Sequence, residues 1–212
     1  YDPTGNLLTV SDAWGNTTTH EYDSRDRLSR RIDPLGKAES FTYDGNGNLT
    51  STIDRKNQTT SFTYDALNRR AQASYADGKT ATFTYDAGSR LTQANDTADP
   101  HRPITLTYDL LDRVLTETTS LGTVSYSYDT AGRRTSMTVS GQNPVSYTYD
   151  ANSRLRTITQ SPLNPVTLDY DAANRRTLLT LPNGVSTQYA YDLSSRLTAL
   201  VYRNALGQLG DL

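Results

Sequence analysis

The stretch Phe41-Thr42-Tyr43-Asp44-Gly45-Asn46-Gly47-Asn48-Leu49-Thr50-Ser51-Thr52-Ile53-Asp54 decides the fold. It opens with one aromatic residue on each side of a threonine. This alternation has the period of two expected for a strand with one buried face. Residues 44–47 are all turn-forming types. A second strand-like run follows from Leu49 to Ile53. The stretch therefore predicts two antiparallel strands joined by a tight turn.

The same pattern returns along the whole chain. A Tyr-Asp pair occurs ten times in 212 residues, and successive pairs lie 21 residues apart except for steps of 23 and 20 around Tyr108. Such a period is typical of repeat proteins, in which each unit buries its apolar surface only against its neighbours. The ten pairs begin at Tyr1, Tyr22, Tyr43, Tyr64, Tyr85, Tyr108, Tyr128, Tyr149, Tyr170 and Tyr191.

Three further positions of the repeat have an expected role. The aspartate after each tyrosine can accept backbone N–H groups of the turn. The fourth residue after the tyrosine is always glycine or a small polar residue, as a type I turn with a left-handed residue and a bulge requires. The fifth is arginine in eight copies and asparagine in two, close enough to pair with the aspartate.

The predicted structural-motif residues are Tyr22, Asp23, Arg27, Leu28, Tyr43, Asp44, Gly47, Leu49, Tyr64, Asp65, Arg69, Tyr85, Asp86, Arg90, Leu91, Tyr108, Asp109, Arg113, Tyr128, Asp129, Gly132, Arg133, Tyr149, Asp150, Arg154, Tyr170, Asp171, Arg175, Tyr191, Asp192 and Arg196. In three copies a second arginine follows the first, and the apolar residues after it change parity. We interpret this as a bulge or a change of face at Arg70, Arg134 and Arg176.

A second turn closes each repeat, as at Asp12-Ala-Trp-Gly15 and Asp33-Pro-Leu-Gly36. The fold class is therefore all-β: a repetitive antiparallel meander of about twenty strands. A twisted sheet of that width does not stay flat, so we expect it to coil into a spiral or shell. We expect residues 1–212 to form a single array of about ten repeats. Because neither end has a distinct capping unit, we expect a segment of a longer array.

Composition narrows the function classes. Only 34% of residues are hydrophobic, but 15 regularly spaced tyrosines argue against a disordered chain. A net charge of −2 provides no general attraction to nucleic acid or anionic membranes. The chain has no cysteine, which excludes disulfides and thiolate chemistry. No apolar run approaches the length of a membrane span.

The pattern Tyr-Asp-x-x-Gly-Arg-Leu resembles the YD repeat of the Rhs family, with close copies at Tyr22–Leu28 and Tyr85–Leu91. That family includes bacterial polymorphic toxins, wall-associated proteins, components of insecticidal toxin complexes, and teneurins. The resemblance implies a β-sheet that spirals into a hollow cocoon, which in the toxins encloses a C-terminal toxic domain. Ten repeats are fewer than a full cocoon is expected to need, so we expect a partial shell.

The resulting hypothesis is a non-catalytic structural array, without cofactor or metal, that encapsulates or scaffolds a toxin or effector domain. Its expected partners are further repeats or an enclosed domain of the same longer polypeptide. Its expected location is secreted or cell-surface, with the export signal outside this chain. The alternative is an adhesion module in which exposed tyrosines, arginines and Trp14 contact cell-surface glycans or proteins.

The remaining chemical candidates have structural interpretations. Asp33-Pro-Leu-Gly36 resembles the autoproteolytic sequence of Rhs proteins, but it falls where every repeat has its second turn. The repeated Asp–Arg sets lie in equivalent surroundings, whereas an acid–base pair needs two different environments. His20 and His101 lie in distant repeats without companion ligands, and His20 replaces the bulky strand residue before Tyr22. We therefore predict no catalytic site, and an autoproteolytic enzyme is the least favoured hypothesis.

Overall fold

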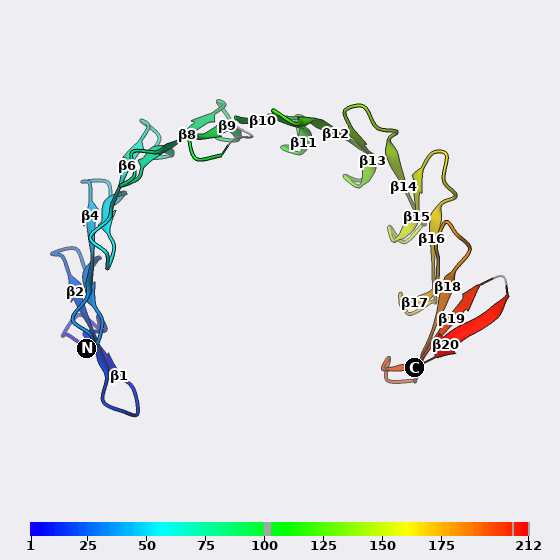
Figure 1. Ribbon diagram of the computed structural model, residues 1–212, viewed down its shortest axis with the longest axis horizontal. Coiled ribbons are helices and arrows are strands. Elements are labelled where there is room, and N and C mark those ends of the chain that lie inside the picture. Colours follow the sequence, from blue (N-terminus) through cyan, green and yellow to red (C-terminus); the bar gives the residue numbers. More distant parts are fainter. Residues whose placement is uncertain (100–102, 205, 212) are drawn as a thin grey trace. The chain divides into compact units, whose positions relative to one another are not determined.

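The computed structural model describes residues 1–99, 103–204 and 206–211, and every regular element in them is a β-strand (Figure 1). The all-β prediction and the number of strands are confirmed. The strands are β1 (Thr9–Ser11), β2 (Thr17–Tyr22), β3 (Leu28–Ile32), β4 (Ala38–Tyr43), β5 (Leu49–Ile53), β6 (Thr59–Tyr64), β7 (Arg70–Ser74), β8 (Thr80–Tyr85), β9 (Leu91–Asp96), β10 (Ile104–Tyr108), β11 (Val114–Thr119), β12 (Gly122–Tyr128), β13 (Arg134–Val139), β14 (Val145–Tyr149), β15 (Leu155–Gln160), β16 (Val166–Tyr170), β17 (Arg176–Thr180), β18 (Ser186–Tyr191), β19 (Leu197–Asn204) and β20 (Gly207–Asp211).

The chain divides into two compact units, Tyr1–Thr105 and Leu106–Leu212. In unit 1, each strand from β1 to β9 pairs antiparallel with the next, and the first residues of β10 pair with β9. In unit 2, the strands from β11 to β20 pair in the same consecutive way. Each unit is therefore an antiparallel meander, as the alternating strand and turn signals predict.

A bulge occurs just before the motif tyrosine in repeats of both units. In β4 the register shifts between Thr42 and Tyr43, so that Tyr43 lies opposite Leu49. The cause is the fourth residue after the tyrosine, which has a positive φ in all ten copies, from 56° at Asp26 to 94° at Gly5. A left-handed residue at this point adds one residue to the returning strand. The predicted turn conformation is confirmed.

The register decides between our two interpretations of the double-arginine copies: the bulge is confirmed, and it is not special to these copies. Arg70 lies opposite Tyr64 in the register that Leu49 has opposite Tyr43. The change of parity after Arg70, Arg134 and Arg176 is therefore present in the other repeats too. It results from the shared bulge and does not mark a special change of face in those three copies.

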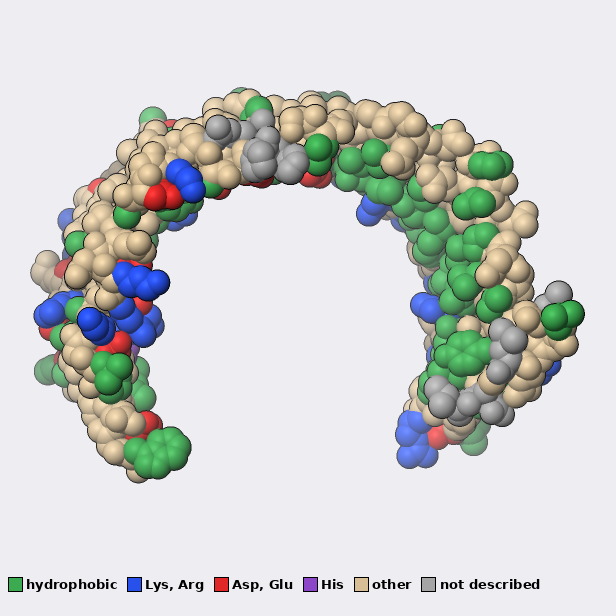
Figure 2. All heavy atoms as spheres, in the orientation of Figure 1, with side chains coloured by type: hydrophobic (Ala, Val, Ile, Leu, Met, Phe, Trp, Pro, Cys, Tyr) green, Lys and Arg blue, Asp and Glu red, His purple; other side chains and the backbone are tan. Residues whose placement is uncertain are grey.

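The two faces of each meander differ in chemistry. One face carries the bulky residues, which lie opposite one another in pairs such as Tyr147 and Ile158. The other face carries hydroxyl pairs, for example Thr148 and Thr157, whose Oγ1 atoms lie 2.7 Å apart. We call the first one the aromatic face; in unit 2, Figure 2 shows hydrophobic side chains gathered over β14 to β18.

No second layer of described residues covers these faces, so the core is thin. Among the residues that the structure describes, only Ala73, Ala81 and Leu168 are buried hydrophobic residues, at 3%, 5% and 6% exposure. Most strand residues are half-buried. Apolar burial alone therefore gives modest stability per residue, and the polar contacts of the turns assume more importance.

Candidate functional site

The aspartate of each Tyr-Asp pair organises its turn from within. In the copy at Tyr43, the Oδ1 atom of Asp44 accepts the backbone N–H groups of Asn46 at 2.9 Å and Asn48 at 2.8 Å. The turn is closed by the Gly47 N–H, which donates to the Asp44 carbonyl at 3.2 Å. Because the Asp44 side chain accepts these two N–H groups, the backbone of the turn is hydrogen-bonded without a contact to a second layer of structure.

The second carboxylate oxygen holds the arginine five residues after the tyrosine. Nε of Arg154, for example, donates to Oδ2 of Asp150 at 2.7 Å. Where asparagine replaces arginine, its amide performs the same contact, as Asn48 Nδ2 does to Asp44 Oδ2 at 2.9 Å. The local ion pairs predicted from the sequence form in all eight copies: Asp23–Arg27, Asp65–Arg69, Asp86–Arg90, Asp109–Arg113, Asp129–Arg133, Asp150–Arg154, Asp171–Arg175 and Asp192–Arg196.

These bonds favour the charged carboxylate. Hydrogen bonds from the Arg27 side chain, together with those from the Arg25 and Arg27 backbone, lower the pKa of Asp23 to about 2. The pKa of Asp65 is lowered as well, chiefly by the backbone N–H of Arg69 and then by its side chain. The direction is the same at equivalent positions, which fits a structural ion pair and not an acid–base pair with separated pKa values.

The same arginine also contacts the next repeat, and this contact was not predicted from the sequence. The guanidinium of Arg27 lies over the ring of Tyr43, 4.5 Å from its centroid, and its Nη1 donates to the Asp44 carbonyl at 3.1 Å. Ring contacts of the same kind, between 4.6 and 4.8 Å, join Arg69 to Tyr85, Arg113 to Tyr128, Arg133 to Tyr149, Arg154 to Tyr170 and Arg175 to Tyr191. A cation over an aromatic face is attractive, and arginine suits this stacked geometry.

The tyrosine hydroxyl completes the link by donating backwards. Oη of Tyr43 donates to the Leu28 carbonyl at 2.8 Å, fifteen residues earlier. The equivalent bonds, of 2.8 to 3.0 Å, run from Tyr22 to Leu7, Tyr64 to Leu49, Tyr85 to Arg70, Tyr128 to Val114, Tyr149 to Arg134, Tyr170 to Leu155 and Tyr191 to Arg176. Phenylalanine lacks this donor, which explains why the position is tyrosine.

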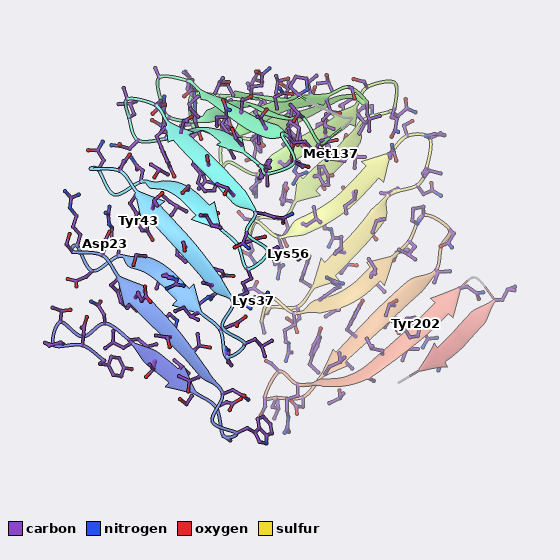
Figure 3. The ribbon with its side chains drawn as sticks, turned by 60° about the vertical axis from the view of Figure 1, so that its left-hand side comes forward. Asp23, Lys37, Tyr43, Lys56, Met137 and Tyr202 are labelled. Carbon is purple, nitrogen blue, oxygen red and sulfur yellow. The ribbon has the colours of Figure 1, made fainter. Side chains whose placement is uncertain are left out.

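The positive-φ residue adds a further contact between repeats. The Nη1 atom of Arg154 donates to Oδ1 of Asn174 at 2.9 Å, and Nη1 of Arg133 donates to Oγ of Ser153 at 3.1 Å. Together, these contacts form what we call the Asp–Arg–Tyr ladder: each Asp–Arg pair with the ring, hydroxyl and turn of the following repeat. Figure 3 shows Asp23 and Tyr43 at one end of the strands of unit 1, with Lys37 and Lys56 at the other end.

The other sequence candidates lie apart from the ladder. Asp33-Pro-Leu-Gly36 is a turn of the same kind, with the Gly36 N–H donating to the Asp33 carbonyl at 2.9 Å and a φ of 74° at Gly36. His20 lies in β2 opposite Arg31, and its Nδ1 has no hydrogen-bond partner among the described residues. Trp14 is 87% exposed at the β1–β2 turn. His101 lies outside the described residues.

The described residues contain no group of three or more His, Cys, Asp or Glu side chains placed to hold a metal ion. They also contain no helix with the length and apolar character needed to cross a membrane. The ladder holds charge and shape. Every aspartate in it is bonded within its own turn, and the following arginines each also stack on the tyrosine ring of the next repeat: Arg27, Arg69, Arg113, Arg133, Arg154 and Arg175.

Comparisons with known proteins identify the same repeats. Residues 74–209 match the family model described as teneurin YD-shell, and residues 1–38 and 43–80 match the RHS repeat. No curated protein matches the chain.

Among solved structures, "Crystal Structure of TcdB2-TccC3" aligns over 100% of this chain with 19% identity and a TM-score of 0.63. A Photorhabdus luminescens Tc holotoxin pore aligns over 100% of this chain with 15% identity and a TM-score of 0.59. The chain spans only 15% and 14% of the length of those two chains. At this identity, the likeness shows a shared fold.

Proposed function

Because the chain belongs to the teneurin YD-shell family of RHS-repeat proteins, we propose that it forms part of a β-shell that encloses a toxin or effector domain. The enclosed domain and the further repeats would belong to the same longer polypeptide. We place that polypeptide outside the cell or on its surface. In this proposal the chain is a structural part of the shell and performs no catalysis.

The observation that carries the proposal is the ladder. Each link uses the hydroxyl of one tyrosine, the guanidinium of one arginine and the carboxylate of one aspartate inside the sheet, as at Asp23, Arg27 and Tyr43. Hydroxyl, guanidinium and carboxylate groups that form these contacts between repeats are not free to bind a substrate. Their repetition stabilises a wide sheet with a thin core, which is the property that a container wall needs.

The aromatic face supports the enclosing role. A contiguous apolar surface on a soluble protein indicates a contact with another molecule or segment. Such a face, lined by Tyr147, Ile158 and Leu168, provides a wall against which a polypeptide can pack. On β14 and β15 the opposite face carries hydroxyl pairs such as Thr148 and Thr157, which suit contact with water.

An adhesion module has less support. Trp14, 87% exposed, offers one ring for stacking on a sugar. The motif tyrosines, however, direct their hydroxyls to backbone carbonyls, and most of their rings lie under arginines of the ladder. Glycan binding by the repeated tyrosines would require those contacts to be given up.

Limited proteolysis of the natural longer polypeptide tests the proposal. We expect the domain that follows the repeats to resist a protease that cleaves the same domain rapidly when it is expressed alone. Mild unfolding of the repeats should remove the protection. Equal cleavage of the enclosed and isolated domains would contradict the shell. Incubating the 212-residue chain and weighing it by mass spectrometry tests the absence of self-cleavage separately.

A further inference from the structure

Two arginines of unit 2 lie on the aromatic face without an acidic partner among the described residues. Arg134 and Arg176 occupy the sixth position after their tyrosines, where other repeats have Leu155 and Leu197. The Arg134 guanidinium lies 5.3 and 5.6 Å from the ring centroids of Tyr126 and Tyr147. That of Arg176 lies 5.6 Å from the centroid of Tyr189. Neither forms an ion pair within the described part of unit 2, in contrast to the arginines of the ladder.

These two charges are uncompensated on that face. Strands β13 to β19 contain three other charged residues, and the register and contacts put all of them on the opposite face. Arg156 pairs there with Asp169, and Arg203 donates to Gln188. The aromatic face of these strands therefore combines apolar side chains with two guanidinium groups, both exposed. An exposed guanidinium among aromatic rings is suited to a bidentate contact with a carboxylate.

There is room for a ligand beside Arg134. A cavity of about 460 Å³ is lined by Tyr128, Gly132, Arg134, Tyr147, Tyr149 and Leu155. This volume falls within the range of small-ligand sites, about 300–1,000 Å³. Its walls are aromatic and aliphatic, and its charged group is Arg134. The site thus favours a carboxylate attached to, or next to, an apolar group.

We propose that the aromatic face of unit 2 binds an extended polypeptide segment through carboxylates on Arg134 and Arg176, with apolar side chains of the segment between them. This inference rests on the proposed shell, because the segment would belong to the enclosed domain. The two arginines lie on β13 and β17, four strands apart, or about 19 Å at the usual strand spacing. An extended segment covers that distance in about six residues, and an even spacing directs both carboxylates to the same side.

Peptide binding to the 212-residue chain tests the inference by fluorescence anisotropy. One labelled peptide carries glutamates at positions i and i+6 in an apolar background, a second carries glutamines there, and a third carries glutamates at i and i+3. We expect the first to bind about tenfold more tightly than either of the others. Arg134→Leu and Arg176→Leu should each weaken its binding about tenfold, and the double variant should lose the preference for acid over amide.

The chain supplies its own controls for folding and charge. The leucine variants should fold, because another repeat has a leucine, Leu155, at the same position. The backbone carbonyl of residue 134 also still accepts the hydrogen bond from the Tyr149 hydroxyl. Arg156→Gln removes one positive charge from the hydroxyl face and should leave peptide binding unchanged. Equal binding of the acid and amide peptides, or an unaffected double variant, would overturn the inference. Since proteolytic protection of the enclosed domain is measured separately, its presence with no acid preference would refute this inference alone.

Discussion

Removing one hydroxyl from the ladder should destabilise the sheet by a predictable amount. In Tyr43→Phe the ring stays under Arg27, 4.5 Å from the guanidinium carbon, and no cavity forms. What is lost is the bond from Oη to the Leu28 carbonyl at 2.8 Å. A hydrogen bond of this kind contributes about 1 kcal/mol net, so the free energy of unfolding should fall by about that amount.

Three such changes should add. Tyr22, Tyr43 and Tyr64 donate to three different carbonyls and lie in successive repeats, about 9.6 Å apart. Sites at this separation without shared partners are usually additive, so the triple phenylalanine variant should lose about 3 kcal/mol. For a chain of this length that corresponds to a fall in Tm of about 6–12 °C.

Thermal unfolding followed by circular dichroism measures the effect, and Tyr75→Phe is the matched control. Tyr75 is 40% exposed, and its hydroxyl makes no hydrogen bond to the described residues, so the same chemical change should leave Tm within about 1 °C. If the triple variant had the same Tm as the Tyr75→Phe variant, the hydroxyl bonds would not hold the repeats together.

Three further predictions address the other parts of the ladder. Arg27→Lys keeps the charge but loses the paired bonds to Asp23 and the flat stack on the Tyr43 ring, so it should lower Tm by several degrees. The control Arg30→Lys, at an exposed contact with Glu21, should change Tm little. Ser153 has a φ of 63°; Ser153→Val should cost roughly 1–2 kcal/mol in chemical denaturation, while Ser153→Asn, the residue found at Asn174, should be neutral or stabilising. Finally, the pKa of Asp23 in the folded chain is about 2, below its ordinary value. The stabilising effect of the charged carboxylate is therefore complete above about pH 4 and is lost as the pH falls toward 2. Tm should fall over the same pH range, and Asp23→Asn should make that fall shallower.

The local structure could be predicted from the sequence because each part depends on neighbouring residues. The period of two around Phe41 and Tyr43, the Asp44 turn and the positive φ at Gly47 are all local effects, and the structure has them. The ion pair within each turn was predictable for the same reason, since the aspartate and arginine flank one turn of fixed geometry.

The contacts between repeats could not be predicted from one repeat. Whether the Arg27 guanidinium ends over Tyr43 depends on the position of the next hairpin, and the target of the Tyr43 hydroxyl is a carbonyl fifteen residues away. The signal was nevertheless present: the position is tyrosine in all ten copies and never phenylalanine, which indicates a required hydroxyl. The change of parity after Arg70 left a bulge and a change of face both open, because a bulge shifts the strand period without a change in residue type.

The central claim is that the aromatic face of these repeats covers an enclosed polypeptide. Electron cryo-microscopy of the longer polypeptide that we propose tests it most directly. The account predicts density for additional polypeptide against the face that carries Tyr147, Ile158 and Leu168, with the hydroxyl face of Thr148 and Thr157 toward solvent. An aromatic face open to solvent, with the following domain located outside the sheet, would contradict it.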